Sequence, residues 1–248
     1  MKGQGQFFME FTKYKYLEDS DQVKGLPQPP LVLSKDNPDN EVVNLPDPKE
    51  VKVNKKDITD VINDRVSVRA YADKEMSLDE LTYLLWVTQG IKTVSNRPAT
   101  LRTVPSAGCR HPFETYLLIN RVTGLKPGLY KYLPMDNQLE IISLEDGIDK
   151  KLTAACYKQV MVERCGVTFI WTAVRYRNYW RYGERGYRYV HLDAGHVCQN
   201  LYLASDVVDC GVCGIAAFYD DEINSILGLD GVERYTVYVA TCGKRRDA

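Results

Sequence analysis

The chain has 248 residues, and its 32 basic and 33 acidic side chains give a formal net charge of −1 at pH 7. This balance provides no general attraction to nucleic acid or to an anionic membrane surface. No apolar run approaches the roughly 20 residues that a membrane-spanning helix needs. Because the polar N-terminus does not resemble a secretory signal, we expect a cytoplasmic protein.

The first 55 residues differ in composition from the rest. Six of the eleven prolines lie between Pro27 and Pro48, and proline favours extended backbone. Disordered tails are usually poor in aromatic residues, whereas this stretch contains Phe7, Phe8, Phe11, Tyr14 and Tyr16. We therefore predict that residues 1–55 form an extended arm docked on a folded surface, and that residues 56–248 form one domain.

Regular elements become recognisable from Ile58 onwards. Ser77-Leu78-Asp79-Glu80 is a capping box, which predicts a helix that ends near Gly90. Apolar, β-prone runs separated by turn residues predict strands at 113–120, 128–133 and 139–143. Apolar residues at helical spacing predict one continuous helix at 148–165.

The last third of the chain continues in the same way. We predict strands at 167–174 and 232–241, and a short helix from Asp220 to Leu227. Residues 193–208 are apolar almost all round, which predicts a buried central helix. Helices and strands alternate irregularly and hairpins dominate. This favours an α+β fold with a mostly antiparallel sheet over a doubly wound parallel sheet.

Cysteines and histidines do not indicate a metal or disulfide framework. The seven cysteines are an odd number scattered through the chain, which favours a reducing compartment. Cys210 and Cys213 form a single CxxC, which we interpret as structural because no second ligand pair accompanies it. His191 and His196 are five residues apart, a spacing that does not align them on a helix for a metal.

The polar pattern Arg65-Val-Ser-Val-Arg69 is the most informative one in the chain. Side chains alternate in an extended strand, so Arg65, Ser67 and Arg69 project from one face. Two guanidinium groups beside a hydroxyl suit a phosphate and sugar hydroxyls. The small-residue segment from Pro105 to Pro112 lets backbone approach a flat ligand closely. Together the two segments indicate a planar, phosphorylated cofactor.

Residues 175–189 interleave five arginines with six aromatic side chains. Such a mixture can bind single-stranded nucleic acid, but the chain is slightly acidic and has no accompanying RNA-binding signature. We predict instead a lid over the ligand or part of a subunit interface.

Several motifs occur in a fixed order that is similar to a known family. They are Arg-x-Ser-x-Arg before a capped helix, Pro-Ser-Ala-Gly-x-Arg-His-Pro, Tyr182 to Tyr189, His191-Leu-Asp-Ala-Gly-His196 and Gln199-Asn-Leu201. This order resembles the SagB-type (thiazole-forming oxidase-like) dehydrogenases of the FMN-dependent nitroreductase superfamily. Segments 12–14, 20–22 and 24–30 resemble the short, stand-alone members.

The resemblance implies a nitroreductase-like FMN-binding fold and an intertwined homodimer, on which the arm would dock. It implies that Arg65, Ser67 and Arg69 contact the phosphate and ribityl chain of FMN. It also implies that a second segment, from the partner subunit, reaches the same FMN, and that a loop faces the flavin edge. The residues concerned are Pro105, Ser106, Ala107 and Gly108 in the segment, and Gly214, Ile215, Ala216 and Ala217 in the loop. Lys244 and Arg245 match a C-terminal phosphate ligand more loosely.

The implied activity is the transfer of two electrons, as hydride, between NAD(P)H and an organic acceptor, either a small molecule or a peptide. A positive charge near the flavin stabilises the reduced ring, and Arg69 or Arg110 is placed to supply it. Where many superfamily members have Asn or Gln, this chain has Cys109, Arg110 and His111, which departs from the nitroaromatic-reducing pattern. His111 either lines the substrate face or belongs to the core. The alternatives are a BluB-like enzyme that fragments its own flavin and a non-catalytic flavin-binding subunit.

Overall fold

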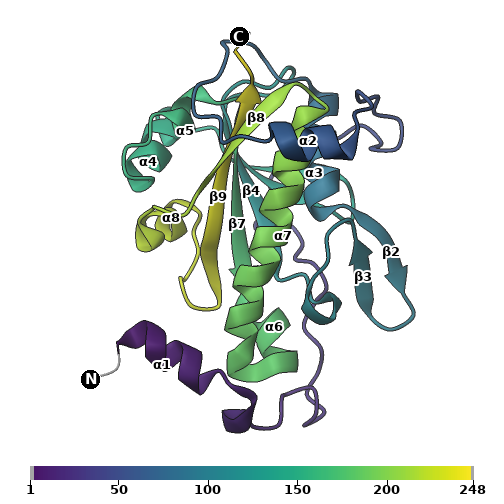
Figure 1. Ribbon diagram of the computed structural model, residues 1–248, viewed down its shortest axis with the longest axis vertical. Coiled ribbons are helices and arrows are strands. Elements are labelled where there is room, and N and C mark those ends of the chain that lie inside the picture. Colours follow the sequence, from purple (N-terminus) through teal and green to yellow (C-terminus); the bar gives the residue numbers. More distant parts are fainter. Residues whose placement is uncertain (1–2, 247–248) are drawn as a thin grey trace.

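The computed structural model describes residues 3–246 and is built on a seven-stranded antiparallel sheet (Figure 1). The strands in spatial order are β1 (Val42–Asn44), β6 (Gln138–Ser143), β5 (Gly128–Leu133), β4 (Phe113–Ile119), β7 (Val167–Val174), β9 (Arg234–Lys244) and β8 (Cys210–Ile215). Every neighbouring pair is antiparallel. The predicted α+β class is therefore confirmed.

Helices cover both faces of the sheet. On one face, α3 (Leu78–Gln89) and α7 (Gly186–Asp206) pack on strand residues such as Leu117 and Phe169. On the other face, α4 (Ile148–Ala155), α5 (Met161–Arg164) and α8 (Asp220–Ile226) pack on residues such as Tyr116 and Ile170. These side chains alternate along β4 and β7, so each central strand is buried on both sides. A separate hairpin, β2 (Ile91–Ser95) with β3 (Ala99–Arg102), lies beside α3.

The capping box at Ser77 forms as predicted. The Ser77 hydroxyl accepts from the Glu80 N–H at 3.1 Å, and the Glu80 carboxylate accepts from the Ser77 N–H at 2.8 Å. These two bonds satisfy amides that have no partner inside the helix. The predicted helix at 77–90 is thus confirmed as α3.

The prediction of one helix at 148–165 is wrong. The segment divides into α4 and α5, because Tyr157 and Lys158 adopt φ angles of 55° and 58°. These are left-handed values that a right-handed helix cannot contain. No glycine or proline marks the break, so composition gave no sign of it.

The central helix α7 also differs from its prediction. It begins at Gly186 rather than Asp193, and it is not buried all round. Five residues form an exposed strip along one side, here called the open stripe: His191, Leu192, Gly195, His196 and Gln199. Within the predicted range, Gly195, His196 and Gln199 are exposed, so the prediction of a helix buried almost all round is wrong on this side.

The arginine- and tyrosine-rich segment is helical and partly buried within its own chain. It contains α6 (Arg175–Tyr182), whose Arg177, Asn178 and Trp180 are buried. The indole N–H of Trp180 donates to the Leu26 carbonyl at 2.9 Å, and Arg177 donates to the Pro30 carbonyl at 3.0 Å. The N-terminal arm therefore lies against α6 within the same chain.

The arm begins with α1 (Gln4–Phe11) and a 3-10 turn (Tyr14–Tyr16), runs extended to β1, and leads into α2 (Ile58–Asp64). Its middle part covers a buried group of charges on the sheet. Lys131, which has no exposed surface, donates to Asp36 at 2.8 Å and to the Ser34 carbonyl at 2.9 Å. Glu140 accepts from the Asp36 N–H at 2.9 Å. These contacts attach the arm through charge-assisted hydrogen bonds.

Burial alone would raise the pKa of Asp36, but hydrogen bonds from Lys131 and Tyr116 outweigh it and lower that pKa below its usual value. Beside this pair, Arg177 and Glu114 form a second buried ion pair at 2.6 Å. Among residues 3–246, no helix combines the length and apolar character that crossing a bilayer requires.

Candidate functional site

The segment that carries Arg65, Ser67 and Arg69 runs beside the edge strand β8. Ser67 forms a parallel bridge with Val212, and the Val68 N–H donates to the Val212 carbonyl at 2.9 Å. The segment is extended as predicted, but it pairs with β8 at this one point rather than as a full strand. It therefore follows β8 closely and leaves its alternate side chains available.

One tyrosine of α7 joins this segment to β8. The hydroxyl of Tyr202 accepts from the Gly214 N–H at 2.7 Å and lies 3.0 Å from the Ser67 hydroxyl. The Arg65 guanidinium lies over the Tyr202 ring, 5.6 Å from its centroid. Sequence reasoning missed Tyr202, because 135 residues separate it from Ser67 and no local pattern marks it. The structure thus brings Arg65, Ser67 and Gly214 together around one phenol.

Arg69 faces a strongly basic cavity of about 340 Å³. Four arginines line it: Arg69, Arg121, Arg164 and Arg246. Asp73 is the acidic residue in its lining, and it is already paired with Arg121. Guanidinium groups bind phosphate well, so the cavity suits an anionic group.

Lys244 and Arg245 point elsewhere. Lys244 pairs with Glu80 and donates to the Val208 carbonyl at 2.9 Å. Arg245 pairs with Asp206 at 2.8 Å. Burial lowers the pKa of Lys244, but the bond to Glu80 outweighs it and the pKa is raised. Both side chains are therefore occupied at the C-terminal end of α7, whereas the next residue lines the basic cavity.

The loop after β8 offers free backbone donors. Ala216 and Ala217 are exposed, and within residues 3–246 no acceptor is paired with either amide. The loop is supported by the connection between α4 and α5, in which the Gln159 side chain donates to the Ala217 carbonyl at 3.2 Å. Tyr157 stacks on Tyr219 with centroids 4.3 Å apart. The left-handed turn at 157–158 therefore supports the loop. The sequence analysis did not predict this turn.

The segment Pro105–Gly108 is attached to α7 by a carboxylate. Asp193 accepts from the Ser106 hydroxyl at 2.6 Å and from the Ala107 N–H at 3.2 Å. Burial raises the pKa of Asp193, although these two bonds oppose the shift. Gly108 has a φ of 55°, a value that glycine adopts at little cost. The carboxylate and the glycine together fix the shape of the turn.

His111 belongs to the core rather than to a substrate face. It is 4% exposed, and burial together with the positive charge of Arg102 lowers its pKa to about 3. The guanidinium of Arg110 lies over the Trp180 ring, 5.4 Å from its centroid. Of the two arginines considered for a charge near the flavin, Arg69 belongs to the 65–69 segment, whereas Arg110 follows the Pro105–Gly108 segment and donates to the Gly108 carbonyl at 3.0 Å.

The two halves of the predicted site attach to opposite sides of α7. Ser67 is bonded to Tyr202 and Ser106 to Asp193. Nine residues of α-helix correspond to two and a half turns and about 13 Å. The open stripe of α7 runs between them. The two halves of the site in one chain therefore do not both contact a single flat ligand.

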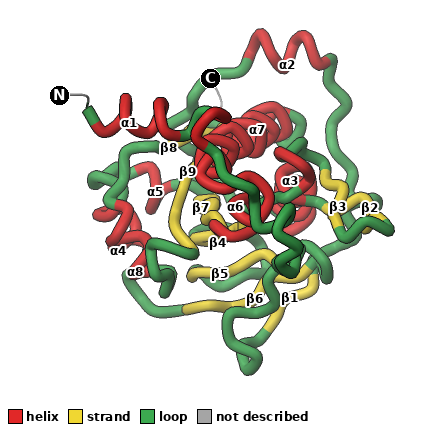
Figure 2. Tube along the Cα trace, turned by 90° about the horizontal axis from the view of Figure 1, so that it is seen from below, coloured by secondary structure: helices red, strands yellow, loops and turns green. Residues whose placement is uncertain are grey.

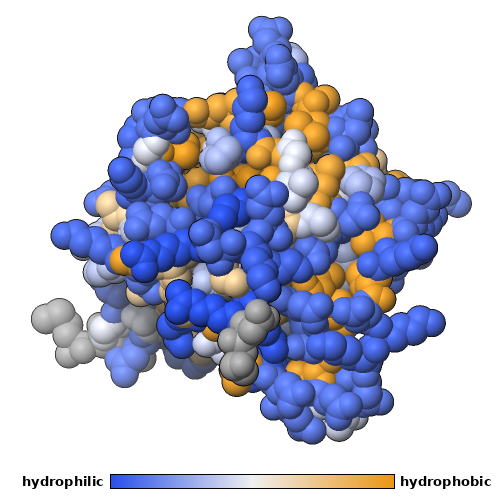
Figure 3. All heavy atoms as spheres, turned by 90° about the horizontal axis from the view of Figure 1, so that it is seen from above, coloured by the Kyte–Doolittle hydropathy of each residue, from blue (hydrophilic) through white to orange (hydrophobic). Residues whose placement is uncertain are grey.

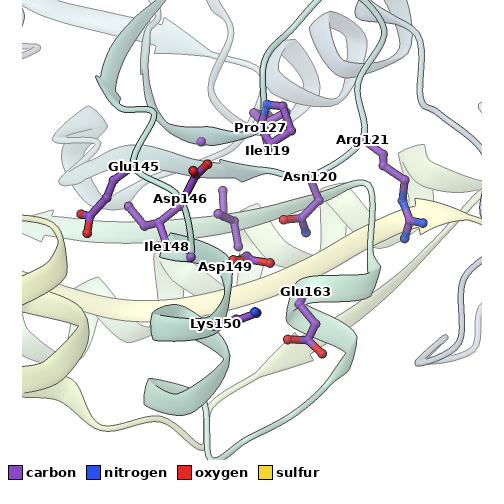
Figure 4. Close-up of a pocket in the computed structure, with 13 residues that line it drawn as sticks. Ile119, Asn120, Arg121, Pro127, Glu145, Asp146, Ile148, Asp149, Lys150 and Glu163 are labelled. Atoms are coloured by element: carbon purple, nitrogen blue, oxygen red, sulfur yellow. The ribbon is translucent and has the colours of Figure 1, made fainter.

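A different cavity, of about 450 Å³, lies where β4 ends and α4 begins (Figure 4). Four carboxylates line it: Glu145, Asp146, Asp149 and Glu163. Lys150 and Arg121 are the basic residues in the same lining. The excess of negative charge makes this cavity a poor site for a phosphorylated ligand.

A model of the nitroreductase family matches residues 62–244. The chain belongs to the nitroreductase family. It is 34% identical to MJ1384, a nitroreductase-like protein of Methanocaldococcus jannaschii, over 82% of this chain and 96% of that one. It is 29% identical to the trifolitoxin-processing protein TfxB of Rhizobium leguminosarum bv. trifolii over 65% of this chain. This nitroreductase-family chain spans 46% of the length of TfxB.

Solved structures confirm the predicted nitroreductase-like fold. A nitroreductase-family structure from Anabaena variabilis superposes with a TM-score of 0.70 and 28% identity, over 84% of this chain and 42% of that one. A second, from Ralstonia eutropha, has a TM-score of 0.68 and 18% identity, over 90% and 96% of the two chains. A third, from Desulfovibrio desulfuricans in complex with FMN, has a TM-score of 0.55 and 16% identity, over 78% and 88%. The protein is thus an oxidoreductase of the nitroreductase family.

Proposed function

We propose that the protein binds FMN and transfers two electrons, as hydride, between NAD(P)H and an organic acceptor. The observation that carries this proposal is the position of residues 65–69 beside β8. This strand connects a basic group of residues, around Arg65 and Ser67, to the free amides of the Ala216–Ala217 loop. Ser67 lies opposite Val212, and β8 continues for three residues, or about 10 Å, to Ile215, directly before the Ala216–Ala217 loop. FMN has the same polarity, with an anionic tail and a flat ring.

The residues at the two ends fit this cofactor. At the basic end, Arg65 and Ser67 are held by Tyr202, and the cavity beside Arg69 contains three further guanidinium groups. At the other end, the amides of Ala216 and Ala217 are available to a ring edge, and small side chains leave room for its face. When bound, FMN supplies the two-electron chemistry; the chain supplies binding, orientation and positive charge.

Arg69 is the residue we assign to charge stabilisation. It is exposed, and it lies close enough to β8 for its charge to oppose the raised pKa of Cys213. A fixed positive charge beside the pyrimidine side of the ring favours the reduced, anionic form. Arg65 and Ser67 hold the ribityl phosphate, and Lys244 and Arg245 support the end of α7 behind it.

We also propose that the protein works as a homodimer. The segment Pro105–Gly108 and the segment 65–69 lie on opposite sides of α7, separated by the open stripe. A second copy packed on the stripe would bring its Pro105–Gly108 segment beside the first copy's Arg65. Each of the two FMN sites would then be completed by both chains.

A SagB-type dehydrogenase activity remains the finer proposal, with a small molecule or a peptide as the acceptor. The likeness to TfxB, a toxin-processing protein, supports it. The E. coli microcin synthetase complex McbBCD, which contains a related fold at 19% identity and a TM-score of 0.58, is in keeping with it. The cytoplasmic location is a proposal that rests on the cysteine pattern.

The test is anaerobic titration of the purified, FMN-supplemented protein with NADH or NADPH. We expect a yellow protein whose visible absorption bleaches with one equivalent of reductant and returns when an acceptor is added. Loss of the flavin itself under air would instead support the flavin-fragmenting alternative. Bound flavin that no reductant bleaches would support a non-catalytic subunit.

Arg65→Ala tests the phosphate end of the site. Loss of a charge-assisted contact worth about 1.5–3 kcal/mol should weaken FMN binding at least about tenfold. Arg97→Ala is the matched control, because Arg97 is exposed in the β2–β3 turn, away from the site. Equal FMN affinity in Arg65→Ala and the wild type would remove Arg65 from the site.

A further inference from the structure

The helix α1 is oriented by polar contacts but is not buried by its own chain. Arg185 donates to the Thr12 carbonyl at 2.8 Å, and the Tyr14 and Tyr189 hydroxyls lie 2.8 Å apart. Arg188 donates to the Met9 carbonyl. None of the eight residues of α1 is buried. A helix this short needs tertiary packing to be stable in water, so its apolar side chains lack the cover that such packing gives.

Three aromatic rings of this region form a continuous exposed surface, here called the aromatic ridge. Phe7 and Phe11 have centroids 4.3 Å apart, and Phe11 and Tyr16 have centroids 5.2 Å apart. Their side chains are 54%, 46% and 44% exposed. A contiguous apolar patch of this kind indicates a binding surface.

A second exposed apolar surface lies on α2. Ile58 and Ile62 are one helical turn apart, and Val66 follows them; the three form the α2 ridge and are 58%, 56% and 56% exposed. Beside them is a groove of about 220 Å³ between α2, α3 and α7. Its apolar lining consists of Ile58, Val61, Val87, Leu203, Ala204 and Val207, with Tyr83. Figure 3, which views this end of the molecule, shows apolar patches bordered by polar side chains.

The two ridges are placed symmetrically about α7. Figure 1 shows α1 at the end of α7 where that helix begins, and α2 at the end where it finishes. Figure 2 shows that α1, α7 and α2 all lie on the side of the molecule away from β5 and β6. A two-fold axis perpendicular to α7 exchanges its ends. It therefore brings α1 of one copy to α2 of the other.

The middle of α7 permits such an approach. Gly195 is at the centre of the open stripe, and nothing lies within 4 Å of the position where its Cβ would be. Small residues at a crossing point let two helices approach closely. The axis required by the two ridges therefore passes through a part of the surface that is free of obstruction.

The charges of the two elements are complementary. The region from Gly3 to Tyr16 carries two lysines and one glutamate, and the lysine side chains are 51% and 60% exposed. Residues 57–64 carry three exposed aspartates and no basic residue, and Lys56, which lines the groove, is already paired with Asp206 at 2.9 Å. Opposite charges around an apolar contact fix its register and suppress wrong pairings.

We infer that α1 is exchanged between subunits: the aromatic ridge of one copy docks on the α2 ridge and the adjoining groove of a second copy. The inference rests on the homodimer of the proposed function and adds to it a specific contact. Because α2 leads directly into Arg65, the partner's α1 would hold the start of the phosphate-binding segment in place. The N-terminal arm would thus support the cofactor site of the other subunit.

Photo-crosslinking tests the contact directly. Phe7 is replaced by benzoylphenylalanine, and the FMN-supplemented protein is mixed from heavy-isotope-labelled and unlabelled chains before irradiation. We expect crosslinked peptides that join one labelled and one unlabelled chain and that contain residues 58–66 or Leu203. The same probe at Met135, which is 47% exposed in the β5–β6 turn on the far side of the sheet, should give no crosslink between chains.

Sedimentation of substituted proteins supplies a second measurement. Phe7→Ser and Ile62→Ser should each raise the dimer dissociation constant about tenfold, and the double variant should do little more than either alone, because both remove one contact. Met135→Ser should leave the constant unchanged.

The outcomes distinguish a failure of the contact between α1 and the partner's α2 from a failure of the proposed homodimer. A dimer whose crosslinks stay within one chain, or reach another surface of the partner, overturns the exchange and leaves the proposed homodimer standing. A wild-type chain that sediments as a monomer overturns both. Binding of α1 to anionic vesicles with unchanged dimer affinity in Phe7→Ser would assign the ridge to a membrane surface and would also overturn the inference.

Discussion

Tyr202→Phe is the most direct test of how the site is assembled. The substitution keeps the aromatic ring under Arg65 and removes only the hydroxyl that bonds Gly214 and Ser67. Each hydrogen bond contributes about 1 kcal/mol net, so the variant should lose about 1–2 kcal/mol of support for the segment beside β8. The expected result is a five- to thirtyfold higher dissociation constant for FMN.

The assay is quenching of flavin fluorescence on titration with apoprotein, at fixed salt. Tyr130→Phe is the matched control, because its hydroxyl donates to the Lys126 carbonyl at 2.8 Å from β5, away from the site. Both variants should lower the melting temperature of the apoprotein by a few degrees. If Tyr202→Phe binds FMN within twofold of the control, the hydroxyl does not organise the site and the reasoning fails.

Three further results are expected. Asp36→Ala leaves the buried Lys131 ammonium without its carboxylate, so stability should fall by about 3 kcal/mol, seen in urea unfolding and in faster limited trypsinolysis of the arm. The pKa of His111 is lowered to about 3, below its unfolded value, so the contribution of neutral His111 to stability is present above about pH 6.5 and is lost as the pH falls. From pH 7 to 4.5 the unfolding free energy should drop by about 3 kcal/mol. His111→Gln should make the unfolding free energy less dependent on pH. Asp193→Asn removes the charged acceptor that fixes the Pro105–Gly108 segment and should weaken FMN binding about tenfold while leaving far-UV circular dichroism unchanged; unchanged affinity would show that the carboxylate is dispensable.

Local signals in the sequence were sufficient wherever one element is defined by its own residues. The capping box at Ser77 gave α3, and β-prone runs between turns gave β5 and β7 with their observed bounds. Strand β8 was not predicted, because Gly211 and Gly214 weaken its β-propensity. It is held instead by the β9 ladder, a long-range contact that no local pattern encodes.

The same limit explains what was missed in the candidate site. Arg65, Ser67 and Arg69 could be proposed from the sequence because alternation is a local property. Tyr202 was missed because its role depends on where α7 passes β8. Lys244 and Arg245 could be identified from the sequence as candidate ligands. Their ion pairs with Glu80 and Asp206 could not be predicted, because these pairs depend on packing at the end of α7.

The attachment of the arm has a consequence for biosynthesis. Asp36 lies near the start of the chain, yet it bonds Arg234, 198 residues later. Closing so long a loop is slow and entropically costly. We therefore expect that the arm, although it is translated before β9, is the last part of the molecule to reach its native position.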